Sequence, residues 1–273
     1  MVGIIGVGNI GSIIVERLLE TGKVGPDELV IFNRSPAKAL RFKEKGVEIA
    51  SNAAEVCEKS TVIFLAVKPQ DAPELFQQIK DCDFGEKLIV STMTGVTIER
   101  IQKSTGCERV VRIMPNVPSA VGRGVVGAAY SPTLDKTNRS HVKQLLDSLG
   151  KIVEVRERDL AAVTALSGSG PAFVFVIVEA LIDAGLRMGL SYETARELIL
   201  ETLKGSAELL QLRGNHPGEF RHLVTSPAGT TIEGIFSLER EGLRGSLMKA
   251  LWDTFEKARY FENRENTADK IKG

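Results

Sequence analysis

The pattern of apolar residues changes once along this chain of 273 residues, near residues 155–160. Before that point, short β-branched runs alternate with amphipathic stretches, and Leu29–Phe32 followed by Pro36–Lys45 is one example. This alternation predicts βαβ units and a mainly parallel sheet with right-handed crossovers. After that point the strand pattern ends and only helices are expected. We therefore predict an α/β domain at residues 1–156 and an all-α domain at residues 157–273.

The elements of both parts can be predicted by residue range. Strands are expected at Val2–Val7, Leu29–Phe32, Thr61–Val67, Leu88–Ser91, Val110–Ile113, Val125–Ala129 and Ile152–Val155. Helices of the first part are expected at Ile10–Leu19, Pro36–Lys45 and Asn138–Leu149. Helices of the second part are expected at Asp159–Ser167, Pro171–Met188, Ser191–Leu212, Thr231–Glu241 and Leu243–Phe261. The polar end, Glu262–Gly273, is expected to fray.

Charge and apolar content exclude several classes of protein. The 35 Lys and Arg residues balance the 35 Asp and Glu residues, so the chain has no general attraction to polyanions. Nucleic acid and acidic lipid are therefore not expected as partners. An apolar share of 43% excludes a mainly disordered chain.

The cysteines and the amino end indicate the compartment. Cys57, Cys82 and Cys107 are odd in number, and no spacing of a metal site or a disulfide framework appears. The amino end is already strand-like, so no signal sequence is expected. The longest apolar stretch, Ala172–Leu186, carries two acidic residues and is interpreted as a buried helix of a soluble protein. We expect a cytoplasmic protein without a metal ion or a membrane anchor.

The all-α part carries apolar residues on more than one helix face, as in the run from Phe173 to Val178. A helix that is apolar all round must be covered on all sides. A homodimer through this domain, or a larger oligomer built from it, would supply the cover. The alternative is a compact monomeric bundle.

A glycine motif lies between the first expected strand and helix. Gly6-Val7-Gly8-Asn9-Ile10-Gly11 has the form G-x-G-x-x-G, and this position gives the motif its meaning. The first glycine permits the tight turn, the second lets backbone N–H groups approach a diphosphate, and the third lets helix and strand pack closely. The diphosphate would lie at the positive end of the helix dipole. The motif predicts a Rossmann-like dinucleotide-binding domain.

The end of the second strand bears on the choice of nicotinamide cofactor. A site for NAD normally places Asp or Glu there to bind the ribose hydroxyls, but this chain continues as Asn33-Arg34-Ser35. Arg34 offers a planar donor fork, and Ser35 a hydroxyl, to a 2′-phosphate. NADPH is therefore favoured, with NADH as a second cofactor. The alternative for Arg34 is a solvated loop cation.

Two further strand ends should border the cofactor groove, since ligands bind at the carboxyl ends of strands in such sheets. They are Ala66-Val67-Lys68-Pro69 and Ser91-Thr92-Met93-Thr94-Gly95. Their small residues allow close approach of the nicotinamide ribose. Without a ligand, each would be an ordinary loop.

Two helix starts in the second part suit a small carboxylate. Ser167–Pro171 precedes a long apolar helix, with Pro171 in the first turn, and Ser226–Thr231 precedes another. Thr230 is expected to cap that second helix in a capping box with Glu233, which leaves the Thr231 hydroxyl free. Both segments offer backbone N–H groups with little side-chain bulk. Two helix starts without any ligand remain the alternative.

Residues for acid–base catalysis are scarce. None of the three histidines has a Ser, Cys or carboxylate partner at a suggestive spacing. No lysine lies between Lys151 and Lys204. A two-domain dehydrogenase that oxidises a hydroxy acid needs a general base or acid, which is often a lysine on the long helix there. Hydride transfer to an acceptor that carries its own positive charge, such as an iminium, fits this composition better.

The motifs together resemble the pyrroline-5-carboxylate reductase family, which catalyses the last step of proline synthesis. The likeness covers nearly the whole chain. It is carried by Gly6–Gly11, Ala66–Pro69, Ser91–Val96, Arg112–Pro118, Ala165–Ala172 and Val224–Thr231. The resemblance implies a Rossmann domain followed by a helical dimerisation domain, and hydride transfer from NAD(P)H to C5 of 1-pyrroline-5-carboxylate to give L-proline.

The resemblance also implies site residues. Those expected to hold the cofactor are Gly6, Val7, Gly8, Asn9, Ile10, Gly11, Asn33, Arg34, Ser35, Asn52, Ala66, Val67, Lys68, Pro69, Thr92, Met93 and Thr94. Those expected to bind substrate are Ser169, Gly170, Pro171, Gly229, Thr230, Thr231 and Asn116, with Thr231 as the catalytic residue at the ring nitrogen. Met93 and Thr94 depart from the family, which usually has a small residue there. Gly214 also departs, since some members have a glutamate at that position.

Three other functions stay open at this point. A reductase of a six-membered cyclic imine would share every motif. A β-hydroxyacid dehydrogenase shares the two-domain layout, but it needs a helix lysine that this chain lacks. A non-catalytic NADPH-binding protein would bind cofactor without imine-dependent oxidation.

Overall fold

The computed structural model describes residues 1–267, and the side chains of residues 1–263. It contains two compact units: Met1–Pro171 together with the chain from Thr254 onward, and Ala172–Asp253. The boundary predicted after residue 156 stays a prediction, because the compact units divide the chain elsewhere.

The first unit is built on one eight-stranded sheet with the order β3-β2-β1-β4-β5-β6-β7-β8. Neighbouring strands are parallel except β6 and β7, which are antiparallel. The strands are β1 Val2–Ile5, β2 Leu29–Phe32, β3 Glu48–Ile49, β4 Val62–Leu65, β5 Leu88–Ser91, β6 Val110–Met114, β7 Gly124–Tyr130 and β8 Gly150–Glu154. The order reverses direction at β1, which has β2 on one side and β4 on the other.

Alternate residues of the central strands enter two separate cores. On one face, Ile4 and Phe64 pack with residues of α1 (Asn9–Glu20), α2 (Pro36–Lys43) and α6 (Lys136–Leu146). On the other face, Ile5 and Ile63 pack with residues of α3 (Ala53–Lys59), α4 (Ala72–Ile79) and α5 (Ile98–Thr105). The central strands are fully buried because helices cover both faces, as expected for a parallel sheet.

A buried arginine connects three segments of this unit. Arg112 of β6 is 2% exposed. Its guanidinium lies 2.8 Å from the Glu157 carboxylate and 3.6 Å from that of Glu262. Glu157 also accepts the backbone N–H of Ile98 at 2.6 Å. A buried guanidinium needs such partners, because an unpaired charge in the interior is costly.

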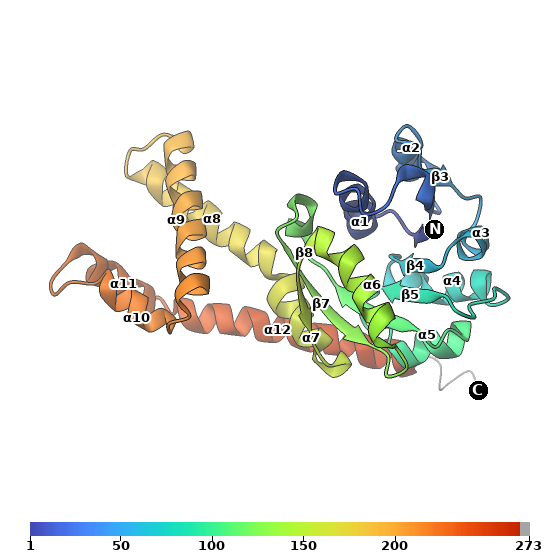
Figure 1. Cartoon of the computed structure of the whole chain (residues 1–273). Coiled ribbons are helices and arrows are strands. Elements are labelled where there is room, and N and C mark those ends of the chain that lie inside the picture. Colours follow the sequence, from blue (N-terminus) through green and yellow to red (C-terminus); the bar gives the residue numbers. More distant parts are fainter. Residues whose placement is uncertain (268–273) are drawn as a thin grey trace. The chain divides into compact units, whose positions relative to one another are not determined.

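Helices follow the sheet along the described chain up to residue 267 (Figure 1). They are α7 Leu160–Val163, a π-helical turn Thr164–Gly168, α8 Gly170–Arg187, α9 Tyr192–Arg213, α10 Pro217–Leu223, α11 Thr230–Arg240 and α12 Leu243–Thr267. The predicted fold class is confirmed: a mainly parallel sheet domain is followed by helices. The sequence patterns did not predict β3, α3, α4, α5 or α10.

The predicted fraying of Glu262–Gly273 is wrong for residues 262–267, which continue α12. The ion pair between Glu262 and Arg112 gives this polar end a partner on the sheet domain. Residues 268–273 lie outside the described part of the chain.

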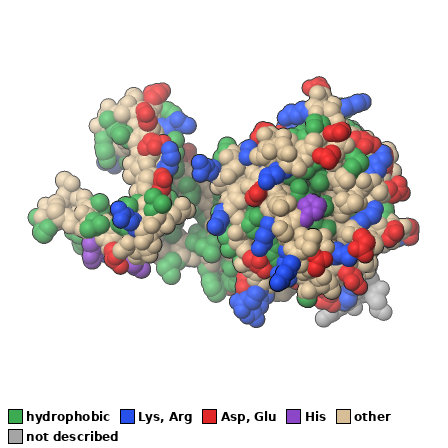
Figure 2. All heavy atoms as spheres, in the orientation of Figure 1, with side chains coloured by type: hydrophobic (Ala, Val, Ile, Leu, Met, Phe, Trp, Pro, Cys, Tyr) green, Lys and Arg blue, Asp and Glu red, His purple; other side chains and the backbone are tan. Residues whose placement is uncertain are grey.

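Apolar side chains remain exposed on the helical unit (Figure 2). In α8, Phe175 is 60% exposed and Val176 is 65% exposed, while Ile182 is buried. The expectation of a buried helix at Ala172–Leu186 is therefore wrong for a single chain, because one copy supplies too few neighbours. By length and composition alone, Glu157–Arg187 could also cross a membrane. Those two properties do not distinguish a membrane span from a helix that another protein chain covers.

Candidate active site

The glycine motif forms a tight turn between β1 and α1. Gly6 has a φ of +98°, and a Cβ atom there would lie 2.7 Å from the carbonyl oxygen of Ala66. A Cβ atom at Gly11 would collide with the carbonyl oxygen of Gly6. Both positions therefore require glycine. A Cβ atom at Gly8 would meet nothing within 4 Å, so this side of the loop is open.

The start of α1 suits an anion. Its N-cap is Gly8, which has no side chain to bond the free amides, and its first turn contains no acidic residue. The positive end of the helix dipole is therefore not neutralised locally. An open glycine loop at such a helix start fits a dinucleotide diphosphate, as the motif predicted.

Asn33 joins the glycine loop to the end of β2. Its Oδ1 accepts the Val7 backbone N–H at 2.9 Å, and its Nδ2 donates to the Ser35 carbonyl oxygen at 2.9 Å. Asn33 thus fixes the position of both loops relative to each other.

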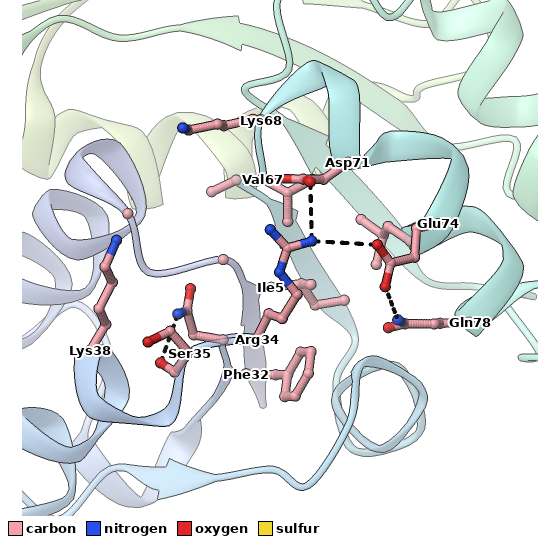
Figure 3. Close-up of a pocket in the computed structure, with 15 residues that line it drawn as sticks. Ile5, Phe32, Arg34, Ser35, Lys38, Val67, Lys68, Asp71, Glu74 and Gln78 are labelled. Atoms are coloured by element: carbon pink, nitrogen blue, oxygen red, sulfur yellow. Dashed lines mark hydrogen bonds and ion pairs between the residues drawn. The ribbon is translucent and has the colours of Figure 1, made fainter.

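One cavity of about 260 Å³ opens at the carboxyl ends of β1, β2 and β4 (Figure 3). It brings together Gly6, Gly8, Asn33, Arg34, Ser35, Ala66, Val67 and Lys68 from the predicted cofactor set. Val7 and Asn9 line a neighbouring hollow at the start of α1. The cavity lies where the strand order reverses at β1, the usual place for a ligand in open α/β sheets.

Arg34 is already paired inside this cavity. Its Nη1 lies 3.2 Å from Asp71 Oδ1 and 3.4 Å from Glu74 Oε2. Gln78 Nε2 in turn donates a hydrogen bond to Glu74 Oε1 at 3.4 Å. The sequence patterns missed Asp71 and Glu74, and also Lys38, which lines the same cavity. The signal that could have found the acids is their place just after β4, next to a strand end already assigned to the groove.

The predicted residues Asn52, Met93 and Thr92 have local structural roles. Asn52 is the N-cap of α3, and its Oδ1 accepts the Glu55 N–H at 2.9 Å. Met93 is 1% exposed and belongs to the core, and its backbone N–H donates to Ser91 Oγ at 3.2 Å. Thr92 donates its backbone N–H to the Leu65 carbonyl oxygen at 3.0 Å.

The segment Ser167–Pro171 is helical, where the sequence suggested a free helix start. The π-helical turn leads into α8, and Ser169 donates its N–H to the Thr164 carbonyl oxygen at 2.8 Å. The expectation that this amide is free for a carboxylate is therefore wrong. The chain stays helical here because the wide π turn accommodates Pro171, which has no N–H to donate.

Asn116 supplies the donor that Pro171 lacks. In a regular helix the Ser167 carbonyl oxygen would accept the N–H of residue 171. Here Asn116 Nδ2 donates to that oxygen at 3.0 Å, while its Oδ1 accepts the Val125 N–H at 2.9 Å. Asn116, which is 7% exposed, thereby holds the Ser169–Pro171 segment in place.

The other predicted helix start differs by one residue from the expectation. Gly229 is the N-cap of α11, so Thr230 is the first helical residue and the predicted capping box with Glu233 is wrong. The turn before it contains Ala228 at a φ of +55°, and Gly229 donates its N–H to the Ser226 carbonyl oxygen. Because the N-cap Gly229 has no side chain, the amides at the start of α11 have no side-chain cap. Thr231 lies in the first turn, as expected. Ser169–Pro171 belongs to the first compact unit and Gly229–Thr231 to the second.

Within residues 1–267, no three His, Cys, Asp or Glu side chains are grouped in a way that could hold a metal ion. Burial raises the pKa of the Cys57 thiol to about 12. That thiol is therefore not a nucleophile near neutral pH.

Comparisons with known proteins agree with this architecture. A family model described as pyrroline-5-carboxylate reductase dimerisation matches residues 157–261, and one described as NADP oxidoreductase coenzyme F420-dependent matches residues 1–95. A pyrroline-5-carboxylate reductase of Aquifex aeolicus is 40% identical over 259 residues, covering 94% of this chain and 96% of the relative. The corresponding protein of Pisum sativum is 34% identical and covers 91% of each chain.

The chain belongs to the pyrroline-5-carboxylate reductase family.

Solved structures of pyrroline-5-carboxylate reductases share the whole fold. The crystal structure of the Plasmodium falciparum protein with NADP bound has a TM-score of 0.88 and 30% identity, covering 96% of this chain and 97% of that chain. The structure of the Coxiella burnetii protein has a TM-score of 0.85 and 34% identity, covering 95% of this chain and 97% of that chain. The resemblance found in the motifs is thereby confirmed, and the match to a dimerisation domain supports a homo-oligomer.

Proposed function

We propose that this chain reduces 1-pyrroline-5-carboxylate to L-proline with NAD(P)H, as the last step of proline biosynthesis. The observation that carries the proposal is the 40% identity, over nearly the full length, to a protein named pyrroline-5-carboxylate reductase. The open glycine loop beside the Arg34 cavity supports the use of a dinucleotide. When bound, the cofactor supplies the hydride that C5 of the ring accepts.

The cofactor-binding residues are proposed to be those predicted from the sequence, with roles sharpened by their contacts. Backbone amides at Gly6–Gly11 bind the diphosphate. Arg34 and Ser35 bind a 2′-phosphate, which favours NADPH over NADH. Asn33 and Asn52 act by holding the loops, since their side chains are already hydrogen-bonded to backbone. The segments Ala66–Pro69 and Thr92–Thr94 border the nicotinamide ribose.

The substrate carboxylate is proposed to bind the uncapped start of α11 at Gly229, Thr230 and Thr231, together with Ser169–Pro171. Backbone amides at a helix start favour an anion. Because the Ser169 amide is engaged, its hydroxyl is the group left for the substrate. Asn116 contributes by fixing this segment and not by direct contact.

Thr231 is proposed to hydrogen-bond at the ring nitrogen, where its hydroxyl oxygen accepts the N–H of the iminium. No lysine is present in α8, so the reaction depends on placement of the two reactants more than on a strong general acid. An iminium nitrogen carries positive charge, and this charge already activates C5 toward hydride. Thr231 then needs only to orient the ring.

The assembly is proposed to be a homodimer through the helical domain at residues 157–273, or a larger oligomer of such dimers. The exposed apolar side chains of α8 would contact a second copy and not lipid, which the match to a dimerisation model supports. The Rossmann domain is proposed to comprise residues 1–156. We further propose a cytoplasmic enzyme with no nucleic-acid partner, consistent with its zero formal charge.

The test is an assay of NADPH loss with 1-pyrroline-5-carboxylate, with L-proline measured as product. It is repeated with NADH and with a six-membered cyclic imino acid. Oxidation that depends on the five-membered substrate supports the proposal. Binding of NADPH without such oxidation would indicate a non-catalytic protein, and faster turnover of the six-membered imine would change the substrate.

A further inference from the structure

The end of β2 lacks an acidic residue, but the fold brings two acidic residues to it from another element. Asp71 ends the short 3₁₀ turn Pro69–Asp71 after β4, and Glu74 lies in the first turn of α4. Strands β2 and β4 flank β1 in parallel, so their carboxyl ends meet at one edge of the sheet. This topology places both carboxylates against Arg34, which follows β2 (Figure 3).

The cations that line the cavity differ in their ion pairs. Arg34 pairs with both carboxylates. Lys38 lines the same cavity on the other side of Ser35 and has no ion pair with the residues that the structure describes (Figure 3). The cation best suited to hold a 2′-phosphate by a donor fork is therefore the one that acids already neutralise.

We propose that Asp71 and Glu74 set the preference of this chain between NADPH and NADH, by competing with the 2′-phosphate for Arg34. The inference rests on the proposed use of a nicotinamide dinucleotide. Both carboxylates contact the guanidinium at Nη1, so a 2′-phosphate that binds Arg34 competes with them for this side chain. A ribose 2′-hydroxyl carries no charge and does not compete with the carboxylates for the guanidinium. The same two acids thus weaken the binding of NADPH and leave that of NADH unchanged.

The geometry limits the size of the effect. The Arg34 side chain is 71% exposed, and its contacts at 3.2 and 3.4 Å are ordinary surface ion pairs. Exposed pairs of this kind are weak, and solvent and salt screen them. A phosphate can therefore displace the acids, and removing both should strengthen NADPH binding by about 3- to 10-fold.

The experiment measures equilibrium binding to the full-length protein without substrate. The variants are D71N, E74Q and the double variant. Glu154→Gln serves as the matched control, because Glu154 also pairs with two cations, Arg139 and Lys143, but does not line the cavity. The probes are NADPH and NADH, together with adenosine 2′,5′-bisphosphate and adenosine 5′-monophosphate, which lack the nicotinamide.

The expected result is tighter binding of both 2′-phosphorylated probes by the double variant, by about 3- to 10-fold, with the other two probes changed by less than about 2-fold. The E154Q control should leave the binding of all four probes unchanged. In an R34M background the two acid substitutions should lose their effect, since they act through Arg34.

Unchanged or weaker binding of NADPH by a folded double variant would overturn the inference. The same applies if the gain persists in the R34M background or appears equally with NADH. If the wild-type protein binds no dinucleotide at all, the proposed function fails together with the inference. If it binds NADPH and only the substitutions are silent, the inference alone fails.

Discussion

The side-chain amide of Asn116 donates a hydrogen bond of 3.0 Å to the carbonyl oxygen of Ser167. Pro171 leaves this oxygen without its usual helical donor, so a residue distant in sequence supplies one. The same side chain accepts the Val125 N–H, which connects the start of β7 to the segment proposed to bind substrate.

Replacing Asn116 should therefore reduce both stability and turnover. Asn116→Ala removes two buried hydrogen bonds and should lower the free energy of unfolding by about 1–3 kcal/mol, measured by urea denaturation. Asn116→Asp keeps an acceptor for Val125 but places carboxylate oxygen against the Ser167 carbonyl, so it should be at least as destabilising. Affinity for NADPH should stay within about 2-fold of the wild-type value. Unaltered stability in both variants would show that the bridge has no structural role.

Thr231 tests the proposed catalytic contact. Thr231→Ala removes a hydroxyl from the first turn of α11 and should lower turnover by about 10- to 100-fold, with unchanged binding of NADPH. Thr231→Ser keeps the hydroxyl and should recover most of the activity. A loss beyond about 10⁴-fold in the alanine variant would instead identify Thr231 as the essential proton donor.

Glu262 provides a prediction about pH. Burial raises the pKa of its carboxyl above the ordinary value of 4.5, although the Arg112 guanidinium acts in the opposite direction. The folded protein therefore holds this proton more tightly than the unfolded chain does. The contribution of Glu262 to stability is complete below pH 4.5 and declines as the pH rises through the raised pKa.

The glutamine in the Glu262→Gln variant cannot ionise, so the stability of this variant should lack the decline with rising pH. Its free energy of unfolding, relative to the wild type, should increase between about pH 4 and about pH 7, measured by urea denaturation at each pH. Glu256→Gln is the control, since Glu256 is an exposed residue of the same helix. A difference that is constant or falls with pH would contradict the assigned effect of burial.

Phe175 tests the proposed dimer. It is 60% exposed in the single chain, so a second copy must cover it if α8 lies in the interface. Phe175→Glu should raise the dimer dissociation constant by about 30-fold or more, measured by light scattering across a dilution series. Leu40→Glu changes a residue of α2 that is 54% exposed and should leave the assembly intact. Equal dissociation of both variants would place the interface elsewhere.

Local sequence patterns were sufficient to predict much of the fold. The strands Leu29–Phe32 and Leu88–Ser91 match their predicted bounds, because each is a continuous apolar run that ends at polar residues. Glu48–Ile49 was missed because a strand of two residues has no periodicity. The continuation of α12 past Phe261 was missed because it depends on Arg112, which is distant in sequence.

In the candidate site, too, local motifs were predicted and contacts between distant segments were missed. The glycine turn and Arg34 were predicted because a motif and its neighbouring elements lie close together in sequence. Asp71 and Glu74 were missed because their meeting with Arg34 depends on the order of β2, β1 and β4. The capping role assigned to Thr230 was wrong by one residue, because Ala228 and Gly229 complete a turn that the capping pattern ignores.

Transfer of labelled hydride is a direct test of the proposed reduction of 1-pyrroline-5-carboxylate. NADPH carrying deuterium at the reactive C4 position is mixed with 1-pyrroline-5-carboxylate and the enzyme, and the product is analysed by mass spectrometry and NMR. The expected product is L-proline with one deuterium at C5. Oxidation of NADPH that leaves the proline unlabelled, or no formation of proline at all, would contradict the proposed reduction.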